Sequence, residues 1–190
     1  MRSESEFLAD IVSRLNAAGV DYMLTGSMAS NYWGIPRTTH DVDIVLTMRP
    51  NQVDALVASL SPGFFIQPDS VRSAFRPPHH FNVMDDQSAI KADFWLLRDL
   101  AFDQSAFKRR VSVSLFGAPT WIATAEDIIL HKLYWNSLTP SERQLGDAAG
   151  VFAVQMNALD VGYLRRWAGE LGVDPELTAI FEGRIKPKST

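Results

Sequence analysis

The sequence predicts an α+β protein: a mixed β-sheet flanked by helices, followed by a C-terminal helical bundle. Strand-like segments occur only before residue 124, with helical patterns between them, and four helical segments follow one another after it. A chain of 190 residues can bury a substantial core as one domain, or as one domain with a small annex. We expect an α/β core over 1–123, a helical subdomain over 124–183 and a loose basic tail over 184–190.

The first half alternates helices with short strands. Ser3 and Glu6 stand in capping-box spacing before a one-sided apolar pattern that ends at Gly19, which predicts a first helix. The elements expected next, in chain order, are strand 20–26, a short helix 27–33, strand 41–48, helix 51–60, a loop region 62–80 with a helical patch at 69–75, a β-hairpin of strands 80–84 and 89–97, helix 99–109, and strands 111–116 and 118–123.

Helix-start signals divide the second half. The expected helices begin at Thr124, Thr139, Asp160 and Asp174, where Thr or Asp can act as the N-cap. In two of them proline stands at the first helical position, which favours a helix start.

The composition excludes several classes of protein. Hydrophobic residues make up 46% and charged residues 21%, and no run of eighteen apolar residues occurs, so we expect no membrane span. The first residues lack the pattern of a secretory signal, and there is no cysteine; both fit a cytoplasmic location. A net charge of −4 argues against broad nucleic-acid binding, although a nucleic acid could still be a substrate.

Gly26 and Ser27 stand between the first strand and the short helix. Glycine permits a tight turn, and the free N–H groups of a helix start, together with the serine hydroxyl, favour a phosphate. The alternative is an ordinary turn followed by a helix cap, which is the commoner meaning of this short motif.

Asp41 and Asp43 are two residues apart at the start of a strand and therefore project from the same face. Two adjacent carboxylates repel each other unless a cation lies between them, and oxygen ligands of this kind suit Mg²⁺ or Mn²⁺. The alternative is that Asp41 caps the strand entry and Asp43 is solvated.

Asp93 lies at the centre of an apolar strand, where an ionised side chain is costly without a partner. It is therefore the candidate for the third carboxylate that a two-metal phosphoryl-transfer site needs. Asp85 and Asp86 compete for this role, but their position in a polar turn favours solvated turn residues.

The ordered set Gly26-Ser27, Asp41-x-Asp43 and Asp93 resembles the nucleotidyltransferase superfamily with the polymerase-beta-like minimal fold. The segment Gly34 to Asp43, "GIPRTTHDVD", is similar to a subgroup pattern found in abortive-infection (AbiEii-like) toxins and related bacterial nucleotidyltransferases. In the helical half, "TAEDIILHKLYW" and "SERQLGDAAGVF" are similar to segments of that branch, so the resemblance spans about residues 20 to 170.

The resemblance implies a nucleotidyltransferase-like fold whose helical subdomain completes a cleft. It implies Mg-dependent transfer of a nucleoside monophosphate from a nucleoside triphosphate such as ATP to an acceptor hydroxyl of tRNA, protein or a small molecule. It also implies the toxin of a toxin–antitoxin pair, with an antitoxin as partner. The implied site residues are Asp41, Asp43 and Asp93 for catalysis and two Mg²⁺ (or Mn²⁺) ions, and Gly26, Ser27, Arg37, Lys132 and Asp147 for the nucleotide.

Alternatives stay open at several of these positions. Lys132 has apolar helical neighbours, so its ammonium needs either an anion or a route along a surface groove to solvent. Arg143 and Asp147 are four residues apart, which is the spacing of an exposed pair within one helix. The whole chain could also be a nonenzymatic nucleotide-binding or interaction module, although such a module has little need for Asp93.

Overall fold

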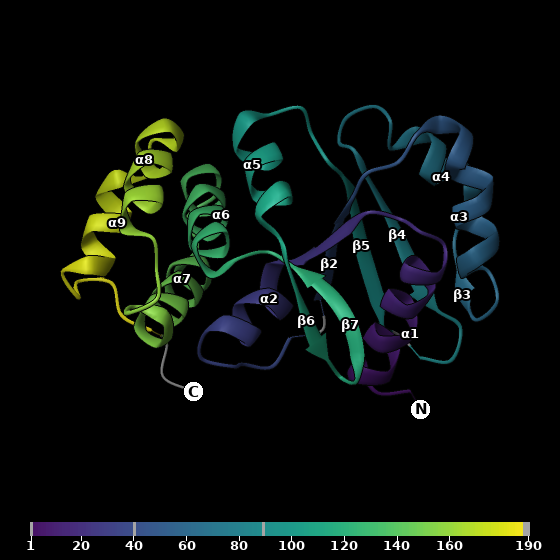
Figure 1. Ribbon diagram of the computed structural model, residues 1–190, viewed down its shortest axis with the longest axis horizontal. Coiled ribbons are helices and arrows are strands. Elements are labelled where there is room, and N and C mark those ends of the chain that lie inside the picture. The colour runs from purple at the N-terminus through teal and green to yellow at the C-terminus, as the bar shows by residue number, and fades with distance from the viewer. Residues whose placement is uncertain (1, 40, 89, 188–190) are drawn as a thin grey trace. The chain divides into compact units, whose positions relative to one another are not determined.

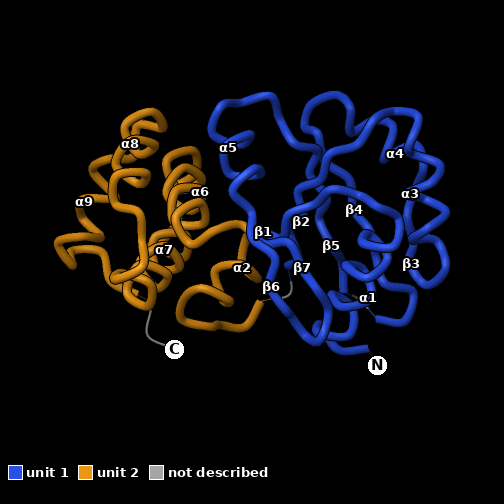
Figure 2. The backbone as a smooth tube through the Cα atoms, in the orientation of Figure 1, with its two compact units in different colours: residues 1–25, 40–122 blue, residues 26–39, 123–190 orange. Residues whose placement is uncertain are grey.

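The computed structural model describes residues 2–39, 41–88 and 90–187. These residues form two compact units (Figure 2), of which unit 1 comprises 1–25 and 40–122 and unit 2 comprises 26–39 and 123–190. Of the expected tail, 184–187 form neither helix nor strand, and 188–190 lie outside the described residues. Each unit therefore combines segments that are separated in the sequence.

Unit 1 contains the sheet and four α-helices of the described chain (Figure 1). Its elements are α1 (Glu4–Ala17), β1 (Tyr22–Thr25), β2 (Asp41–Leu46), the 3-10 turn η1 (Pro50–Gln52), α3 (Val53–Leu60), β3 (Phe64–Phe65), α4 (Pro68–Ser73), β4 (His80–Asp85), β5 (Lys91–Leu96), α5 (Ala101–Arg109), β6 (Val111–Leu115) and β7 (Ala118–Ile122). The strand order is β3-β4-β5-β2-β1-β7-β6. Because β1 pairs with β7 and β2 with β5 in parallel while the other pairs are antiparallel, the sheet is mixed, and the predicted α+β class is confirmed.

The two faces of the sheet differ in burial. In β2, β4 and β5 every second residue is buried, including Ile44, Phe81 and Phe94, and the rings of Phe81 and Phe94 stack 5.1 Å apart. The residues between them are exposed or half-buried. We call this second side the polar face; its residues on the three strands are Asp41, Asp43, Val45, His80, Asn82, Met84, Lys91, Asp93 and Trp95.

Helix α1 begins as predicted. Ser3 and Glu6 form the capping box, and Phe7 lies in the buried row of α1 with its ring edge-on to Phe64 at 5.6 Å. The main departure in unit 1 is β3, which lies in the segment expected to be a loop. A strand of two residues is too short to produce a recognisable alternation, which explains why the sequence did not indicate it.

Unit 2 is entirely helical within the described residues. Its elements are α2 (Gly26–Trp33), α6 (Ala125–Leu138), α7 (Glu142–Gln155), α8 (Val161–Leu171) and α9 (Asp174–Phe181). Helices α6 and α7 pack together, α2 packs on both, and α8 and α9 extend the bundle. The predicted bundle is thus present, with α2 as an added member from early in the chain.

Two of the four expected N-caps are confirmed in unit 2. Thr124 and Asp160 accept hydrogen bonds from backbone N–H groups at the starts of α6 and α8. The expectation for Thr139 is wrong, because Ser141 caps α7, and Asp174 is the first residue of α9 rather than its cap. In the described part of the chain, no helix is long and apolar enough to cross a membrane.

Candidate functional site

The strand pairing of unit 1 brings polar residues into one row. Asp43 of β2 lies opposite Asp93 of β5, Thr25 of β1 lies on the other side of Asp43, and Asn82 of β4 lies beside Asp93. Neighbouring strands are about 4.8 Å apart, so Asp43 and Asp93 are direct neighbours on the polar face. Asp41 is on the same face two residues before Asp43. The three predicted carboxylates therefore come from one face of two adjacent strands.

Asp93 already has several partners in unit 1. Lys91 Nζ lies 3.2 Å from Asp93 Oδ1 and 3.1 Å from Oδ2. The Asn82 amide donates a hydrogen bond to Oδ1, and His80 Nε2 lies 3.4 Å from the same oxygen. From the same strand as Asp93, Trp95 Nε1 donates a hydrogen bond to Asp43 Oδ1 of the neighbouring β2 over 3.4 Å. These contacts hold both carboxylates on the polar face and partly offset the charge of Asp93.

The donor chemistry of this row fits a hard divalent cation, because Asp41, Asp43 and Asp93 supply carboxylate oxygens from neighbouring positions. The side chains do not yet converge: among the described residues, no group of three or more His, Cys, Asp or Glu is arranged to hold a metal ion. Lys91 and Asn82 occupy Asp93 instead. A metal at this row would therefore have to compete with Lys91 for Asp93.

Asp85 has a different role from the one its turn position indicated. Its side chain is buried, accepts a hydrogen bond from Ser88 Oγ at 2.6 Å and pairs with Arg2 at 2.8 Å. Burial acts to raise the pKa of Asp85, but the Ser88 and Arg2 hydrogen bonds outweigh it and lower the pKa overall. Asp85 is thus a buried structural carboxylate, whereas Asp86 is exposed.

Gly26 and Ser27 begin α2 in unit 2. Gly26 has a φ of +63°, a left-handed conformation that glycine adopts without strain, so the chain turns directly from β1 into the helix. Ser27 lies inside α2. Its hydroxyl accepts a hydrogen bond from Arg37 Nη2 at 2.9 Å, so the serine joins the start of α2 to Arg37.

Arg37, Lys132 and Asp147 meet in unit 2. Arg37 forms a bidentate ion pair with Asp147, with Nε to Oδ1 and Nη2 to Oδ2 both at 2.8 Å. Lys132 Nζ donates to Asp147 Oδ2, also at 2.8 Å. We call Ser27, Arg37, Lys132 and Asp147 the cationic cluster, because two of its side chains, Arg37 and Lys132, are cations. The structure thus joins four of the five predicted nucleotide-binding residues.

The electrostatics of the cluster favour an ionised Asp147. Its side chain is 9% exposed and that of Lys132 is 6% exposed. Burial is the largest effect and acts to raise the pKa of Asp147, but the Arg37 hydrogen bond and the Lys132 charge together lower the pKa below its usual value. An anion that binds here would meet cations already held in place by a carboxylate.

These contacts decide two of the open alternatives. Lys132 is buried against an anion, so the interpretation of a lysine that reaches solvent along a groove is wrong. Asp147 pairs with Arg37 and Lys132, so the exposed pair with Arg143 within one helix is also wrong.

Asn31 and Gly34 position Arg37. The Asn31 amide donates to the Arg37 carbonyl at 2.7 Å and accepts from the Arg37 N–H at 3.1 Å, which clamps the backbone of that residue. Gly34 lies against α7, where an added Cβ would be 2.7 Å from the Val151 nitrogen. Glycine is required at this position because the neighbouring atoms belong to the backbone.

Sequence reasoning missed five residues that contact the predicted ones: Asn31, His80, Asn82, Lys91 and Trp95. The register of the β4–β5 hairpin pairs Asn82 with Asp93. A short turn restricts which residues of its two strands can pair, so the predicted hairpin could have indicated this contact. His80 was expected in a proline-rich loop, but it begins β4. For Asn31 no local pattern was available, since its partner lies in an irregular segment.

Comparisons with known proteins add evidence about the fold. No family model and no curated protein matches the sequence. Among solved structures, an antigenic nucleotidyltransferase-like protein from Paracoccidioides brasiliensis matches with a TM-score of 0.56 and 15% identity over 98% of this chain and 94% of that one. The antibiotic-resistance factor ANT(2'')-Ia matches with 0.60 and 12% identity over 95% and 96%.

A third similar structure is a putative nucleotidyltransferase from Thermotoga maritima, with a TM-score of 0.50 and 18% identity over 86% of this chain and 91% of that one. At these identities the likeness concerns the fold. The fold of the chain is thus nucleotidyltransferase-like, as the resemblance carried by Gly-Ser, Asp-x-Asp and Asp implied.

Proposed function

We propose that the protein is a Mg-dependent nucleotidyltransferase that moves a nucleoside monophosphate from a nucleoside triphosphate to an acceptor hydroxyl. The observation that carries the proposal is the row of carboxylates on the polar face, where Asp43 and Asp93 are opposite each other and Asp41 precedes them on the same strand. A fold similar to that of nucleotidyltransferases supports it.

In the proposed reaction, the acceptor oxygen attacks the α-phosphorus of the triphosphate and forms a new O–P bond. The bond between the α-phosphorus and the oxygen that bridges to the β-phosphate breaks, and pyrophosphate leaves with that electron pair. The hydroxyl proton passes to Asp93. Mg²⁺ bound by Asp41, Asp43 and Asp93 would neutralise phosphate charge.

The cationic cluster is the candidate for phosphate binding. Arg37 offers a planar donor set suited to phosphate oxygens, and Lys132 offers a compact ammonium. Both are held by Asp147, so they need little reordering when an anion arrives. Gly26 and Ser27 would add the backbone and hydroxyl donors of the α2 start.

The test is incorporation of label from each α-labelled nucleoside triphosphate, with Mg²⁺ present, into total RNA, total protein and a set of small hydroxylated compounds. Asp43→Asn should lower incorporation at least about 100-fold, because the substitution removes a charge at the reacting centre. Asp99→Asn, the same change at an exposed position of unit 1, should leave it unchanged. No incorporation from any triphosphate would contradict the proposal.

A second candidate function is nucleotide binding without catalysis. The observation that favours it is the Lys91–Asp93 ion pair, which occupies the third carboxylate. This candidate predicts that triphosphate binding, measured by calorimetry, survives Asp43→Asn and that no label is transferred. Loss of transfer in Asp43→Asn together with transfer by the wild-type protein would reject it.

The toxin role is part of the proposal and is supported by the sequence resemblance. It predicts that induced expression arrests bacterial growth and that Asp43→Asn relieves the arrest. Equal arrest by both proteins would separate toxicity from nucleotidyl transfer.

A further inference from the structure

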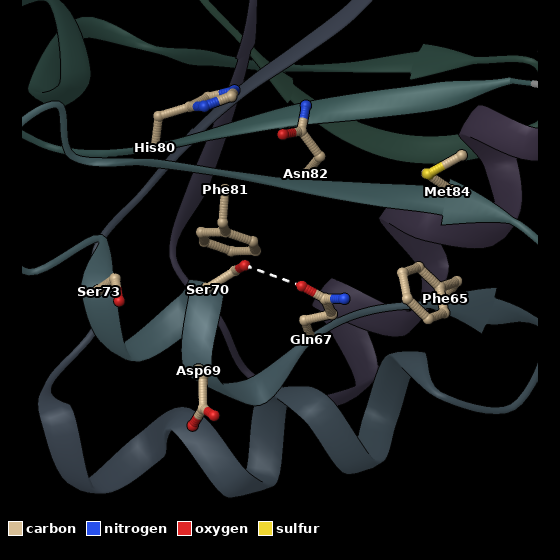
Figure 3. A pocket seen from close by; sticks show the side chains of 9 residues that line it. All are labelled: Phe65, Gln67, Asp69, Ser70, Ser73, His80, Phe81, Asn82 and Met84. Carbon is tan, nitrogen blue, oxygen red and sulfur yellow. Dashed lines mark hydrogen bonds between the residues drawn. The ribbon is translucent and has the colours of Figure 1, made fainter.

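The outer edge of β4 is bordered by a hollow within unit 1. It has a volume of about 460 Å³ and lies among residues of β3, α4 and β4 (Figure 3). Figure 3 shows His80, Asn82 and Met84 on one side of β4 and Phe81 on the other, with Ser70 of α4 near the Phe81 ring. A hollow of this size accommodates a small molecule.

The hollow adjoins the predicted carboxylate. Two of its lining residues, His80 and Asn82, contact Asp93 Oδ1. His80 and Asn82 therefore border both the hollow and Asp93.

The strand edge contributes backbone groups. Strand β3 pairs only with Met84 and Asp85, so no strand of the described chain covers β4 from His80 to Val83. Asp85 N donates to Ile90 O and Leu96 N to His79 O, so the odd-numbered residues of β4 bond to β5. The N–H and C=O groups of His80 and Asn82 consequently point outward, beside the hollow.

The lining combines polar groups with exposed apolar surface. Gln67, Ser70 and Ser73 provide amide and hydroxyl groups, while Phe65 is 53% exposed and Met84 is 46% exposed. Hydroxyl and amide groups match a ligand with several hydroxyls, and the flat Phe65 ring matches a ring face.

The charges of the residues that line the hollow exclude an anionic polymer as its ligand. Among the described residues, no Lys or Arg lines the hollow, and its carboxylate, Asp69, already pairs with Arg72 at 3.0 Å. Binding RNA needs cations at the phosphates. Strand addition by a peptide needs a longer edge than the two outward-facing residues, His80 and Asn82, provide.

We propose that this hollow is the acceptor site and that the acceptor is a small, ring-containing molecule with several hydroxyl groups and no anionic group. The proposal rests on the proposed function, because the acceptor hydroxyl attacks the α-phosphorus, pyrophosphate departs and Asp93 receives the proton. It assigns acceptor recognition to α4 and β4.

The first experiment measures binding without catalysis. Maltose, kanamycin, glucose 6-phosphate and unfractionated tRNA are titrated by ligand-observed NMR against the wild-type protein and three variants. Ser73→Trp fills the hollow from an exposed position of α4, Ser13→Trp makes the same change at an exposed position of α1, and Asp43→Asn removes the reacting centre.

We expect maltose or kanamycin to bind the wild-type protein, Ser13→Trp and Asp43→Asn alike, and Ser73→Trp to weaken binding at least about ten-fold. Maltose and kanamycin distinguish a neutral from a cationic acceptor. Binding of neither sugar, equal binding by Ser73→Trp and Ser13→Trp, or preferential binding of glucose 6-phosphate or tRNA would overturn the proposal.

The second experiment uses α-labelled triphosphates with the same compounds. Transfer to the bound sugar should fall in Ser73→Trp through a higher KM, while triphosphate binding stays at the wild-type level. Transfer of label to tRNA at a rate that Ser73→Trp does not change would overturn the acceptor assignment and leave the proposed function intact. Sugar binding in the hollow without transfer by any protein would refute the proposed function and, with it, the acceptor role.

Discussion

Asp147 shows how one carboxylate can organise a site. It is buried between Arg37 and Lys132, and it holds the guanidinium through two hydrogen bonds. Removing its charge leaves two cations close together and shielded from water. Breaking a buried ion pair costs more free energy than breaking an exposed one, because little solvent reaches the charges that remain.

We therefore expect Asp147→Asn to lower the free energy of unfolding by about 2–4 kcal/mol at pH 7. The pKa of Asp147 is lowered in the folded state, so its contribution is complete above the usual value of 3.8 and is lost as the pH falls through the folded-state pKa. Urea unfolding from pH 7 to pH 2.5 measures this. The difference from wild type should shrink only below about pH 4, and a constant difference at all pH values would contradict the assignment. Asp99→Asn is the control.

Lys91 is the second residue whose effect can be measured. Its ammonium competes with any cation for Asp93, but its side chain is 46% exposed, so the ion pair is screened by solvent. We expect Lys91→Met to increase Mn²⁺ affinity about two- to five-fold, as read by Mn²⁺ electron paramagnetic resonance. Lys108→Met, at an exposed position of α5, should not change it. Weaker Mn²⁺ binding in Lys91→Met would show that the lysine supports the site.

Single residues explain part of what the sequence predicted about the site. The same-face placement of Asp41 and Asp43 follows from strand alternation, which is local. The Lys91–Asp93 pair follows from the same rule, since both residues lie on one strand two positions apart. This pair was not predicted from the sequence. The partners of Asp147 could not be inferred, because Arg37 is 110 positions away.

Helices α2 and α7 provide a prediction at the level of elements. A methyl group at Gly34 would meet backbone atoms of Val151 and Gly150 at 2.7–3.0 Å, whereas one at Gly150 would meet Ile35 at an ordinary 3.6 Å. Gly34→Ala should lower the free energy of unfolding by about 1–3 kcal/mol. Gly150→Ala, inside α7, should leave it unchanged or raise it by up to about 1 kcal/mol, because alanine favours the helix.

Chemical denaturation of both variants measures the contrast. Equal destabilisation would show that any added methyl disturbs the contact, and stabilisation by Gly34→Ala would show that α2 and α7 are farther apart than described. Arg37 should lose its pairing with Asp147 in Gly34→Ala if α2 moves.

The limits of most elements were predictable because their signals are local. The capping box of α1 and the caps of α6 and α8 each lie within a few residues. The start of α7 was misplaced by the choice of Thr139 over Ser141, since both residues can cap a helix and the sequence alone does not rank them.

The whole molecule contains a helical unit built from two distant segments. Residues 26–39 contribute α2 and Arg37 to unit 2, whose other helices begin after residue 123. We expect a fragment of 123–190 to lack a cooperative thermal transition by circular dichroism, and a fusion of 26–39 to its N-terminus through a glycine–serine linker to restore one. The same fusion carrying Gly34→Trp should show no cooperative transition. Cooperative melting of 123–190 alone would contradict the expectation.

By itself, the sequence determined the order and type of most elements, the alternation that puts Asp41 and Asp43 on one face, and the pattern that resembles nucleotidyltransferases. These properties depend on residues within one or two turns or strands of each other. Only the tertiary structure decided that Asp93 lies opposite Asp43, that Lys132 and Arg37 share Asp147, and that 26–39 packs with the late helices. The reason is physical: strand pairing and helix packing select among distant segments by burial and fit over the whole chain, and no local period encodes that choice.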